Sequence, residues 1–427
     1  MKKIIVLLLA VIMVFSLVAC QPQAPQADAP AADAPAADKP AADKPAADEP
    51  AADAPADAET FKIGFYSPLT GAAATQGIAA QNSVALYIKE LNARGGLLGM
   101  QVEGIYYDDA QDTEEAVKIA TKLIEVDKVD FVISSIISNC VLASGQILED
   151  AQMPFFGMGF SPTFMQQGWK YCIRPTMNSS RSIPYLTVVM KEFGFESVAI
   201  FEGQDDYGAS AGKTMRDACA ADGITVTTTE NYVSGDTDFS GQVAKILGTN
   251  PDCVFLGVLG SEVGNAMKQF RQFGYDGILF YSEPLQQDHY DIAGDATDHI
   301  AFAFPYVTYT DINDCTDDFM YAFLEKYVAE YNELPKGEAA YRAWDAMAVL
   351  EKGVTDAGST AGEDIIEAIY NIKDFQALGG MMDFTNRDGE CLSAFAMYVV
   401  VDQKSVAYDA WKASEDYTEF AAQMGWA

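Results

Sequence analysis

One short segment of the chain has the nucleophile motif of serine hydrolases. Gly208-Ala209-Ser210-Ala211-Gly212 fits the pattern G-x-S-x-G, in which a serine hydroxyl attacks an acyl carbon. The motif requires a sharp turn directly after a strand, whereas residues 203–207 intervene here and Ser210 falls in the first turns of an expected helix. A triad would also need His289 or His299, the only histidines, and neither has a recognisable context. An exported hydrolase built on Ser210 stays a minor alternative, and we expect no enzyme.

Phosphate-loop and metal motifs are also incomplete. Residues 208–214 end in Gly-Lys-Thr, but three residues separate the two glycines where a phosphate loop has four. The two histidines, the lack of any CxxC pair and the lack of EF-hand spacing predict no metal site and no cofactor. Six cysteines follow Cys20 at wide spacing, and their pairing stays open: Cys140, Cys172, Cys219, Cys253, Cys315 and Cys391.

The first twenty residues have the order of a secretory signal. Lys2 and Lys3 precede an apolar stretch over residues 4–15, and small residues then lead to Cys20. The stretch is shorter than the roughly 20 residues of a spanning helix. The segment resembles a bacterial lipoprotein signal, which implies removal of residues 1–19 and lipidation of Cys20; a plain secretion signal with an incidental cysteine is the alternative. We therefore expect a protein anchored on the extracytoplasmic face of the cell membrane.

A low-complexity spacer follows the cysteine. Residues 20–60 contain mainly Ala, Pro and Asp, with a proline at every fifth position from Pro30 to Pro55. Such a segment has too little apolar surface to offset its chain entropy, so we expect a disordered tether. The net charge of −35 repels nucleic acid and anionic membrane surfaces, which excludes nucleic-acid partners and leaves the lipid as the membrane contact.

The remaining body, residues 61–427, is large enough for two lobes. Buried strands alternate with amphipathic helices along most of it, which predicts an α/β fold with doubly wound parallel sheets. In such folds ligands bind beyond the carboxyl ends of the strands, here in the cleft between the lobes. The expected strands are 62–68, 102–107, 131–137, 154–156, 197–201, 224–232, 253–258, 278–281 and 397–401. The expected helices are 75–93, 113–126, 138–152, 181–193, 207–222, 239–247, 262–273, 316–331 and 339–354.

An ordered series of motifs carries a family resemblance. The segments are Lys62-Ile63-Gly64-Phe65, Pro68-Leu69-Thr70-Gly71, Leu91 to Gly96, Tyr107-Asp108-Asp109, Asp206-Tyr207-Gly208, Phe270 to Gly274, Gly379-Gly380, Asp383-Phe384 and Asp388-Gly389. Together they resemble the type I periplasmic solute-binding proteins of ABC importers, in particular the leucine/isoleucine/valine-binding family. The resemblance implies two doubly wound lobes joined by three crossovers, which close over a ligand. It implies lobe 1 from residues 61–177 and 308–385, and lobe 2 from residues 178–307 and 386–427.

The resemblance places the ligand's carboxylate at Ser138, and Asn139 beside it is a further candidate ligand-binding residue. This pair stands between a strand and a helix, where a hydroxyl and free N–H groups suit an anion; a plain helix cap is the alternative. The second anion-side loop contains Gly159, Phe160 and Ser161. The family commonly has a threonine where this chain has Phe160, so the hydroxyl is missing unless Ser161 supplies it. Phe160 would then be either a pocket wall or a core residue.

On the other lobe, the resemblance assigns the ligand's ammonium group to Glu283. Tyr207 matches an aromatic residue that lines the pocket, with a helix-start residue as the alternative. Leu259 and Gln76 stand where the branched-chain binders have aromatic residues. The residues around the ligand's side chain therefore differ from those of the branched-chain binders. A solvated loop acid is the alternative for Glu283.

These observations predict a monomeric, lipid-anchored solute receptor. We expect it to capture an amino acid, branched-chain or related, or a similar small carboxylate, and to deliver it to the permease subunits of an ABC transporter. A ligand-sensing module that reports to a separate signalling partner has the same fold and stays the alternative.

Overall fold

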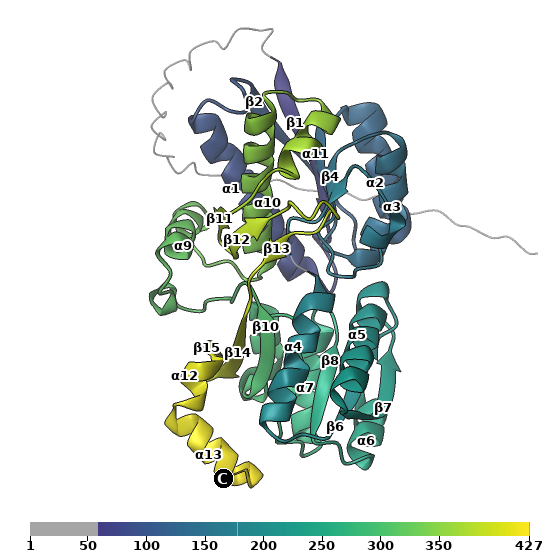
Figure 1. Cartoon of the computed structure of the whole chain (residues 1–427), viewed down its shortest axis with the longest axis vertical. Helices are drawn as coiled ribbons and strands as arrows, with labels where there is room; N and C mark the ends of the chain where they lie inside the picture. Colours follow the sequence, from purple (N-terminus) through teal and green to yellow (C-terminus); the bar gives the residue numbers. More distant parts are fainter. Residues whose placement is uncertain (1–58, 177, 427) are drawn as a thin grey trace, which may run out of the picture. The chain divides into compact units, whose positions relative to one another are not determined.

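The computed structural model describes residues 59–426 with the exception of residue 177 (Figure 1). The predicted signal peptide, Cys20 and nearly all of the predicted spacer therefore lie outside the described residues. Within the described part, no helix is long and apolar enough to cross a membrane. Cys140, Cys172, Cys219, Cys253 and Cys315 are buried there as free thiols.

The first lobe is built on a five-stranded parallel sheet with the order β2-β1-β3-β4-β5. Its strands are β1 (Thr60–Ser67), β2 (Gln101–Asp108), β3 (Phe131–Ile133), β4 (Phe155–Phe156) and β5 (Cys172–Ile173). Helix α1 (Ala74–Ala93) packs with α10 (Ala339–Ala357), and α2 (Thr113–Lys122) packs with α3 (Ser138–Asp150). α9 (Asp318–Tyr331) and α11 (Gly362–Ile369) belong to the same lobe.

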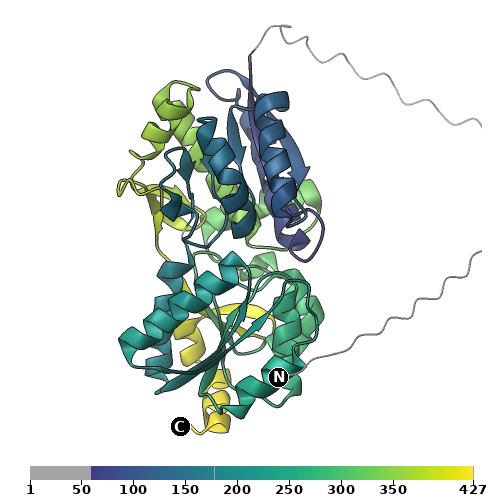
Figure 2. The same cartoon turned by 90° about the vertical axis from the view of Figure 1, so that its right-hand side faces the viewer.

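The second lobe is built on a seven-stranded sheet with the order β15-β14-β10-β9-β8-β6-β7. Its strands are β6 (Ser197–Gly203), β7 (Thr225–Tyr232), β8 (Cys253–Gly257), β9 (Leu279–Tyr281), β10 (Ile300–Phe304), β14 (Ala396–Val401) and β15 (Lys404–Ala407). Its helices are α4 (Ser179–Glu192), α5 (Asp206–Asp222), α6 (Ser240–Gly248), α7 (Glu262–Gln272), α8 (Gln287–Ala293), α12 (Tyr408–Lys412) and α13 (Glu415–Met424). Every residue of β8 is buried, because helices cover both faces of the sheet (Figure 2).

The chain passes between the sheets three times. It leaves the first sheet after β5, returns after β10 to form α9, α10 and α11, and enters the second sheet again at β14. A small antiparallel sheet of β11 (Phe375–Ala377), β12 (Gly380–Asp383) and β13 (Leu392–Ser393) precedes the last passage. The predicted α/β class with two doubly wound sheets and three crossovers is confirmed. The predicted lobe boundaries at residues 177, 307 and 385 stay a proposal.

Several elements differ from the sequence prediction. β14 and β15 pair antiparallel at the edge of the second sheet, and the helices α8, α11, α12 and α13 were not predicted. The strand expected over residues 131–137 ends at Ile133. Ser134 and Ser135 follow it, and their hydroxyls bond to nearby backbone groups, which ends regular strand pairing.

Candidate ligand-binding site

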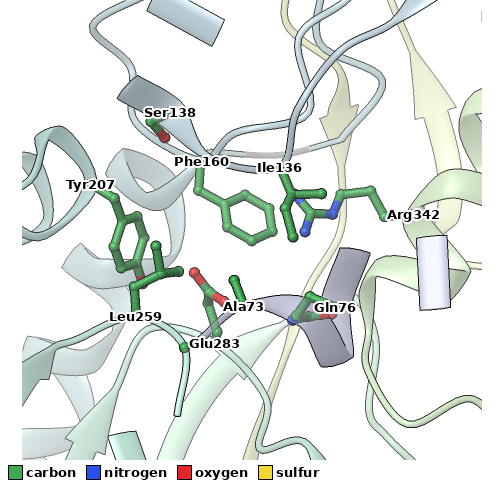
Figure 3. Close-up of a pocket in the computed structure, with 10 residues that line it drawn as sticks. Ala73, Gln76, Ile136, Ser138, Phe160, Tyr207, Leu259, Glu283 and Arg342 are labelled. Atoms are coloured by element: carbon green, nitrogen blue, oxygen red, sulfur yellow. The ribbon is translucent and has the colours of Figure 1, made fainter. Parts of the chain in front are cut away.

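A pocket lies between the two lobes, beyond the carboxyl ends of the strands (Figure 3). The first lobe contributes Ala73, Gln76, Ile136, Ser138, Phe160 and Arg342. The second lobe contributes Tyr207, Leu259, Gly260 and Glu283. The structure therefore brings together Ser138, Phe160, Tyr207 and Glu283 of the predicted site residues. It also places Gln76 and Leu259, where this chain departs from the branched-chain binders, in the pocket wall.

Ser138 is the first residue of α3 and contacts the loop that contains Gly159. The Ser161 N–H donates to the Ser138 Oγ over 3.1 Å. A Cβ at Gly159 would stand 2.7 Å from the Ser138 Oγ and 2.9 Å from the Ser138 Cα, so a side chain at Gly159 would displace Ser138. Gly159 therefore allows close approach of the loop to the start of the helix. The Ser161 hydroxyl bonds to Thr163 instead of the pocket.

The N-terminus of α3 has no side-chain cap. The cap position is Ile137, whose side chain has no acceptor, and the Ser138 hydroxyl accepts from the Ser161 N–H instead of from its own helix. The first N–H groups of a helix lack partners within the helix, and the helix dipole favours an anion there. This end of α3, beside the pocket, is chemically suited to a ligand carboxylate.

Asn139 contacts the second lobe instead of lining the pocket. Its Oδ1 accepts from the backbone N–H of Asp206, at the first residue of α5, over 2.8 Å. The side-chain cap of α5 is Asp205, whose Oδ1 accepts from the Gly208 N–H over 2.9 Å. The two lobes are further joined by backbone hydrogen bonds from Ser261 N to Ala72 O and from Gln287 N to Lys336 O. Asn139 thus links the lobes beside the pocket.

Glu283 follows β9 and is 2% exposed. Its Oε1 has no hydrogen-bond partner among the described residues. Burial raises the pKa of Glu283 to about 8; the charge of Glu338 adds to this, while Arg342 and the Tyr207 hydroxyl oppose it. The hydroxyl of Tyr207 also bonds to the Ser282 Oγ. A carboxyl that is neutral at near-neutral pH and has an Oε1 without a partner will ionise once a cation is placed against it.

Sequence reasoning missed the ion pair of Arg342 and Glu338. Arg342 is 2% exposed and Glu338 is fully buried, and the Nη2 of Arg342 lies 2.7 Å from the Oε1 of Glu338. The pair spans one turn at the start of α10, a helix in which the sequence predicted no site residue. The sequence did contain a signal for this pair, because the two opposite charges are four residues apart in a segment of otherwise apolar Ala, Tyr and Trp residues. Burial raises the pKa of Glu338, and the Arg342 charge opposes that shift.

Phe160 lies in the centre of the lining residues (Figure 3). Its ring lies 4.1 Å from the Arg342 Cζ and packs edge-on against Phe304 at 5.3 Å between centroids. The free space between the lining side chains is close to that of one water molecule. An amino acid therefore fits only after the lobes or Phe160 move apart.

A second buried arginine supports the loop that contains Phe160 and Ser161. Arg174 is fully buried and donates to the carbonyl oxygens of Phe160 and Ser161 over 3.0 and 2.7 Å. Its Nε lies 3.4 Å from the Oε2 of Glu390, and its backbone N–H donates to Gly389 O. Arg174 thus joins the pocket loop to the chain before the last passage between the lobes.

The hydrolase motif forms no catalytic arrangement. Ser210 lies within α5 and donates to the Tyr207 carbonyl over 2.9 Å. His289 bonds to Gly260 O and Gln286 N, and His299 lies 3.2 Å from the Oδ2 of Asp416. Both histidines thus have partners other than Ser210. Over residues 59–426, no group of three or more His, Cys, Asp or Glu side chains is placed to hold a metal ion.

Sequence comparisons find a family model and several relatives that match most of the chain. The model of the periplasmic binding protein family matches residues 60–405. The Leu-, Ile-, Val-, Thr- and Ala-binding protein of Pseudomonas aeruginosa is 26% identical over 315 residues, 73% of this chain and 82% of that protein. A Leu/Ile/Val-binding protein of Rhizobium johnstonii is 24% identical over 343 residues, 79% of this chain and 90% of that protein.

Solved structures show the same fold. The branched-chain amino acid substrate-binding protein of Streptococcus pneumoniae, in complex with isoleucine, has a TM-score of 0.73 at 24% identity and covers 82% of this chain and 98% of its own. A solute-binding protein of R. palustris in complex with benzoate has a TM-score of 0.74 at 20% identity and covers 82% of this chain and 96% of its own. One fold thus holds ligands of different chemistry, so ligand identity depends on the pocket residues.

Proposed function

Because the chain belongs to the periplasmic binding protein family, we propose that it is the lipid-anchored substrate-binding protein of an ABC importer and captures an α-amino acid between its lobes. The relatives named above bind aliphatic amino acids, which supports this ligand class. Family membership implies work outside the cytoplasm, and the leader ending at Cys20 supports a lipid anchor there.

One observation carries the proposal. The uncapped N-terminus of α3 with Ser138, on the first lobe, and Glu283 with its unpartnered Oε1, on the second, line the same pocket. An α-amino acid carries a carboxylate and an ammonium group on one carbon, which complements these two groups. Ser138 and the α3 N–H groups would hold the carboxylate, and Glu283 would hold the ammonium. The ligand would then bond to both lobes at once.

A ligand that bonds to both lobes would stabilise the closed form of the protein, and this is its role in transport. Asn139 and Ser261 already make hydrogen bonds across the lobes beside the pocket, and a bound ligand adds to them. The liganded, closed form would be the one that the permease subunits recognise. The protein would act as a monomer, with Tyr207, Phe160 and the Gly159–Ser161 loop forming the rest of the site.

A thermal-shift screen of the purified full-length protein tests the proposal. The ligands are the proteinogenic amino acids, their 2-hydroxy analogues without the ammonium group, and benzoate. A ligand that binds only the folded state raises the melting temperature by an amount set by its concentration and affinity. We expect an α-amino acid to raise it and its 2-hydroxy analogue to do so much less.

Two variants and two controls assign the site. Ser138→Ala removes one charge-assisted hydrogen bond, which is worth roughly 1.5–3 kcal/mol, so affinity should fall about 10- to 100-fold. Glu283→Gln removes the counter-charge and should weaken binding at least as much. Ser234→Ala and Glu325→Gln change exposed residues of the same types and should bind as the wild type does. Unchanged affinity in both site variants, or no response to any amino acid, would contradict the proposal.

A further inference from the structure

The far end of the pocket has polar groups that an aliphatic ligand would leave without partners. Arg342 lines the pocket opposite Tyr207, and Figure 3 shows its side chain extending toward Ile136 and Phe160. Glu338 lies directly behind, where its Oε1 accepts from the Gln76 Nε2 over 3.1 Å and from Arg342 over 2.7 Å. The ion pair is almost wholly removed from solvent.

Both members of the pair keep an unused polar atom. Arg342 donates from Nη1 to the Met158 carbonyl and from Nη2 to Glu338, while its Nε has no partner among the described residues. The Oε2 of Glu338 also has none there. A buried polar atom without a hydrogen bond costs roughly 1–3 kcal/mol, and more when the group is charged. A ligand that offers one acceptor and one donor would recover this energy.

We propose that the bound amino acid has a side chain ending in a carboxamide or ureido group, whose carbonyl accepts from Arg342 and whose N–H donates to Glu338. This inference rests on the proposed function, because it needs the amino acid's carboxylate at Ser138 and its ammonium at Glu283. The side chain then extends toward Gln76 and Arg342, at the end of the pocket where Gln76 departs from the branched-chain binders.

The charges around the pocket favour a neutral side chain. Arg342 and Glu338 neutralise each other, and the ammonium of the ligand neutralises Glu283. An acidic side chain of the ligand would be attracted by Arg342 but repelled by Glu338. A basic side chain would be attracted by Glu338 but repelled by Arg342. An aliphatic side chain would bury the unused donor and acceptor without partners. An amide or ureido group is neutral and provides both an acceptor and a donor.

One face of the Arg342 guanidinium group is already covered, and the donor without a partner is on its edge. Phe160 lies over that face at 4.1 Å, so the ligand must approach the edge that carries Nε. Once the lobes or Phe160 move apart, a planar group such as an amide would meet this edge in the plane of the guanidinium.

Isothermal titration of the ligand-free full-length protein with matched amino acids tests the inference. The probes are glutamine, asparagine and citrulline, the aliphatic analogues methionine and leucine, and the acids glutamate and aspartate. We expect one of the amide or ureido probes to bind about 100-fold more tightly than its aliphatic and acidic counterparts. Tighter binding of leucine or glutamate would overturn the inference and leave the proposed function intact. Binding of no amino acid would overturn both.

Two variants separate recognition from folding. Glu338→Gln keeps the volume but leaves the Arg342 charge unneutralised, so preference should shift at least about tenfold from the amide toward the matching acid. Glu338→Met with Arg342→Met replaces the pair by apolar side chains, which proteins commonly tolerate, and should shift preference toward the aliphatic probe. The control replaces the exposed pair with the same spacing, Lys213→Gln with Asp217→Asn, and should keep the wild-type order of affinities. An unchanged order in both site variants would contradict the inference.

Discussion

Binding of an amino acid should release one proton from Glu283. In the free protein, burial and the neighbouring Glu338 raise the pKa of this carboxyl to about 8, so it is neutral below that pH. An ammonium group against Oε1 favours the ionised form and lowers the pKa. Affinity must therefore increase with pH up to about 8 and then level off, below the pH at which the ligand's own ammonium group loses its proton.

The size of the effect follows from the difference between the pH and the pKa of Glu283. Each pH unit below about 8 weakens the observed affinity about tenfold, equivalent to about 1.4 kcal/mol. At pH 6 the affinity should be about 100-fold below its plateau, and at pH 7 binding should release close to one proton. The 2-hydroxy analogue, without an ammonium group, should show neither effect.

Isothermal titration of the tightest-binding amino acid at pH 5.5–8.5, in buffers of different ionisation enthalpy, gives both quantities. The Glu283→Gln variant should bind weakly and without this pH dependence, while Glu325→Gln should behave as the wild type. A flat affinity over this range with no proton release would refute the assignment of the ammonium to Glu283.

Three further predictions concern the frame of the site. Gly159→Ala places a Cβ 2.7 Å from the Ser138 Oγ, so it should destabilise the protein by about 1–3 kcal/mol and weaken ligand binding. The control Gly241→Ala, in an open position of α6, should be neutral or stabilising. Denaturant melts and ligand titrations that give the same result for both variants would contradict the packing argument. Arg174→Met leaves Glu390 without its cation and the carbonyls of Phe160 and Ser161 without a donor, so the free energy of unfolding should fall by about 3–5 kcal/mol. An unchanged denaturation midpoint would contradict the role of Arg174 in supporting the pocket loop. In the ligand-free protein, the pKa of Glu283 is higher in the folded than in the unfolded state, so its contribution to stability is complete below about pH 4.5 and declines as pH rises toward 8. Between pH 5 and pH 7 the free energy of unfolding should therefore fall by about 2.5 kcal/mol in the wild type through this group, and Glu283→Gln should lack this loss. Equal losses in denaturant melts of both proteins would contradict the prediction.

The alternation of strands and helices was predictable because buried strands and amphipathic helices have distinct periods. β8 is apolar and buried along its whole length, and α1 shows its buried face in Ala80, Val84 and Leu91. The helix α12 was not predicted because it has only five residues, and α13 was not predicted because Glu415, Asp416 and Glu419 interrupt its apolar pattern. β14 joins the second sheet far from the other strands in sequence, and a pairing over that distance leaves no local pattern.

The pocket was predictable only in part. Ser138 and Glu283 follow strands, so their place at the carboxyl ends was expected. The direction of a side chain is not encoded locally: Asn139 bonds to the other lobe and Ser161 to Thr163, although both stand beside pocket residues in sequence. Arg342 comes from α10, more than fifty residues after Glu283, and only the folded chain brings the two to one cavity.

A crystal structure of the protein with its tightest-binding amino acid tests the central claim most directly. We predict the ammonium nitrogen within about 3.2 Å of the Glu283 carboxylate, and the ligand carboxylate against the Ser138 Oγ and the first N–H groups of α3. A ligand bound in reverse, with its carboxylate on Arg342, or one bound outside the pocket, would contradict the account.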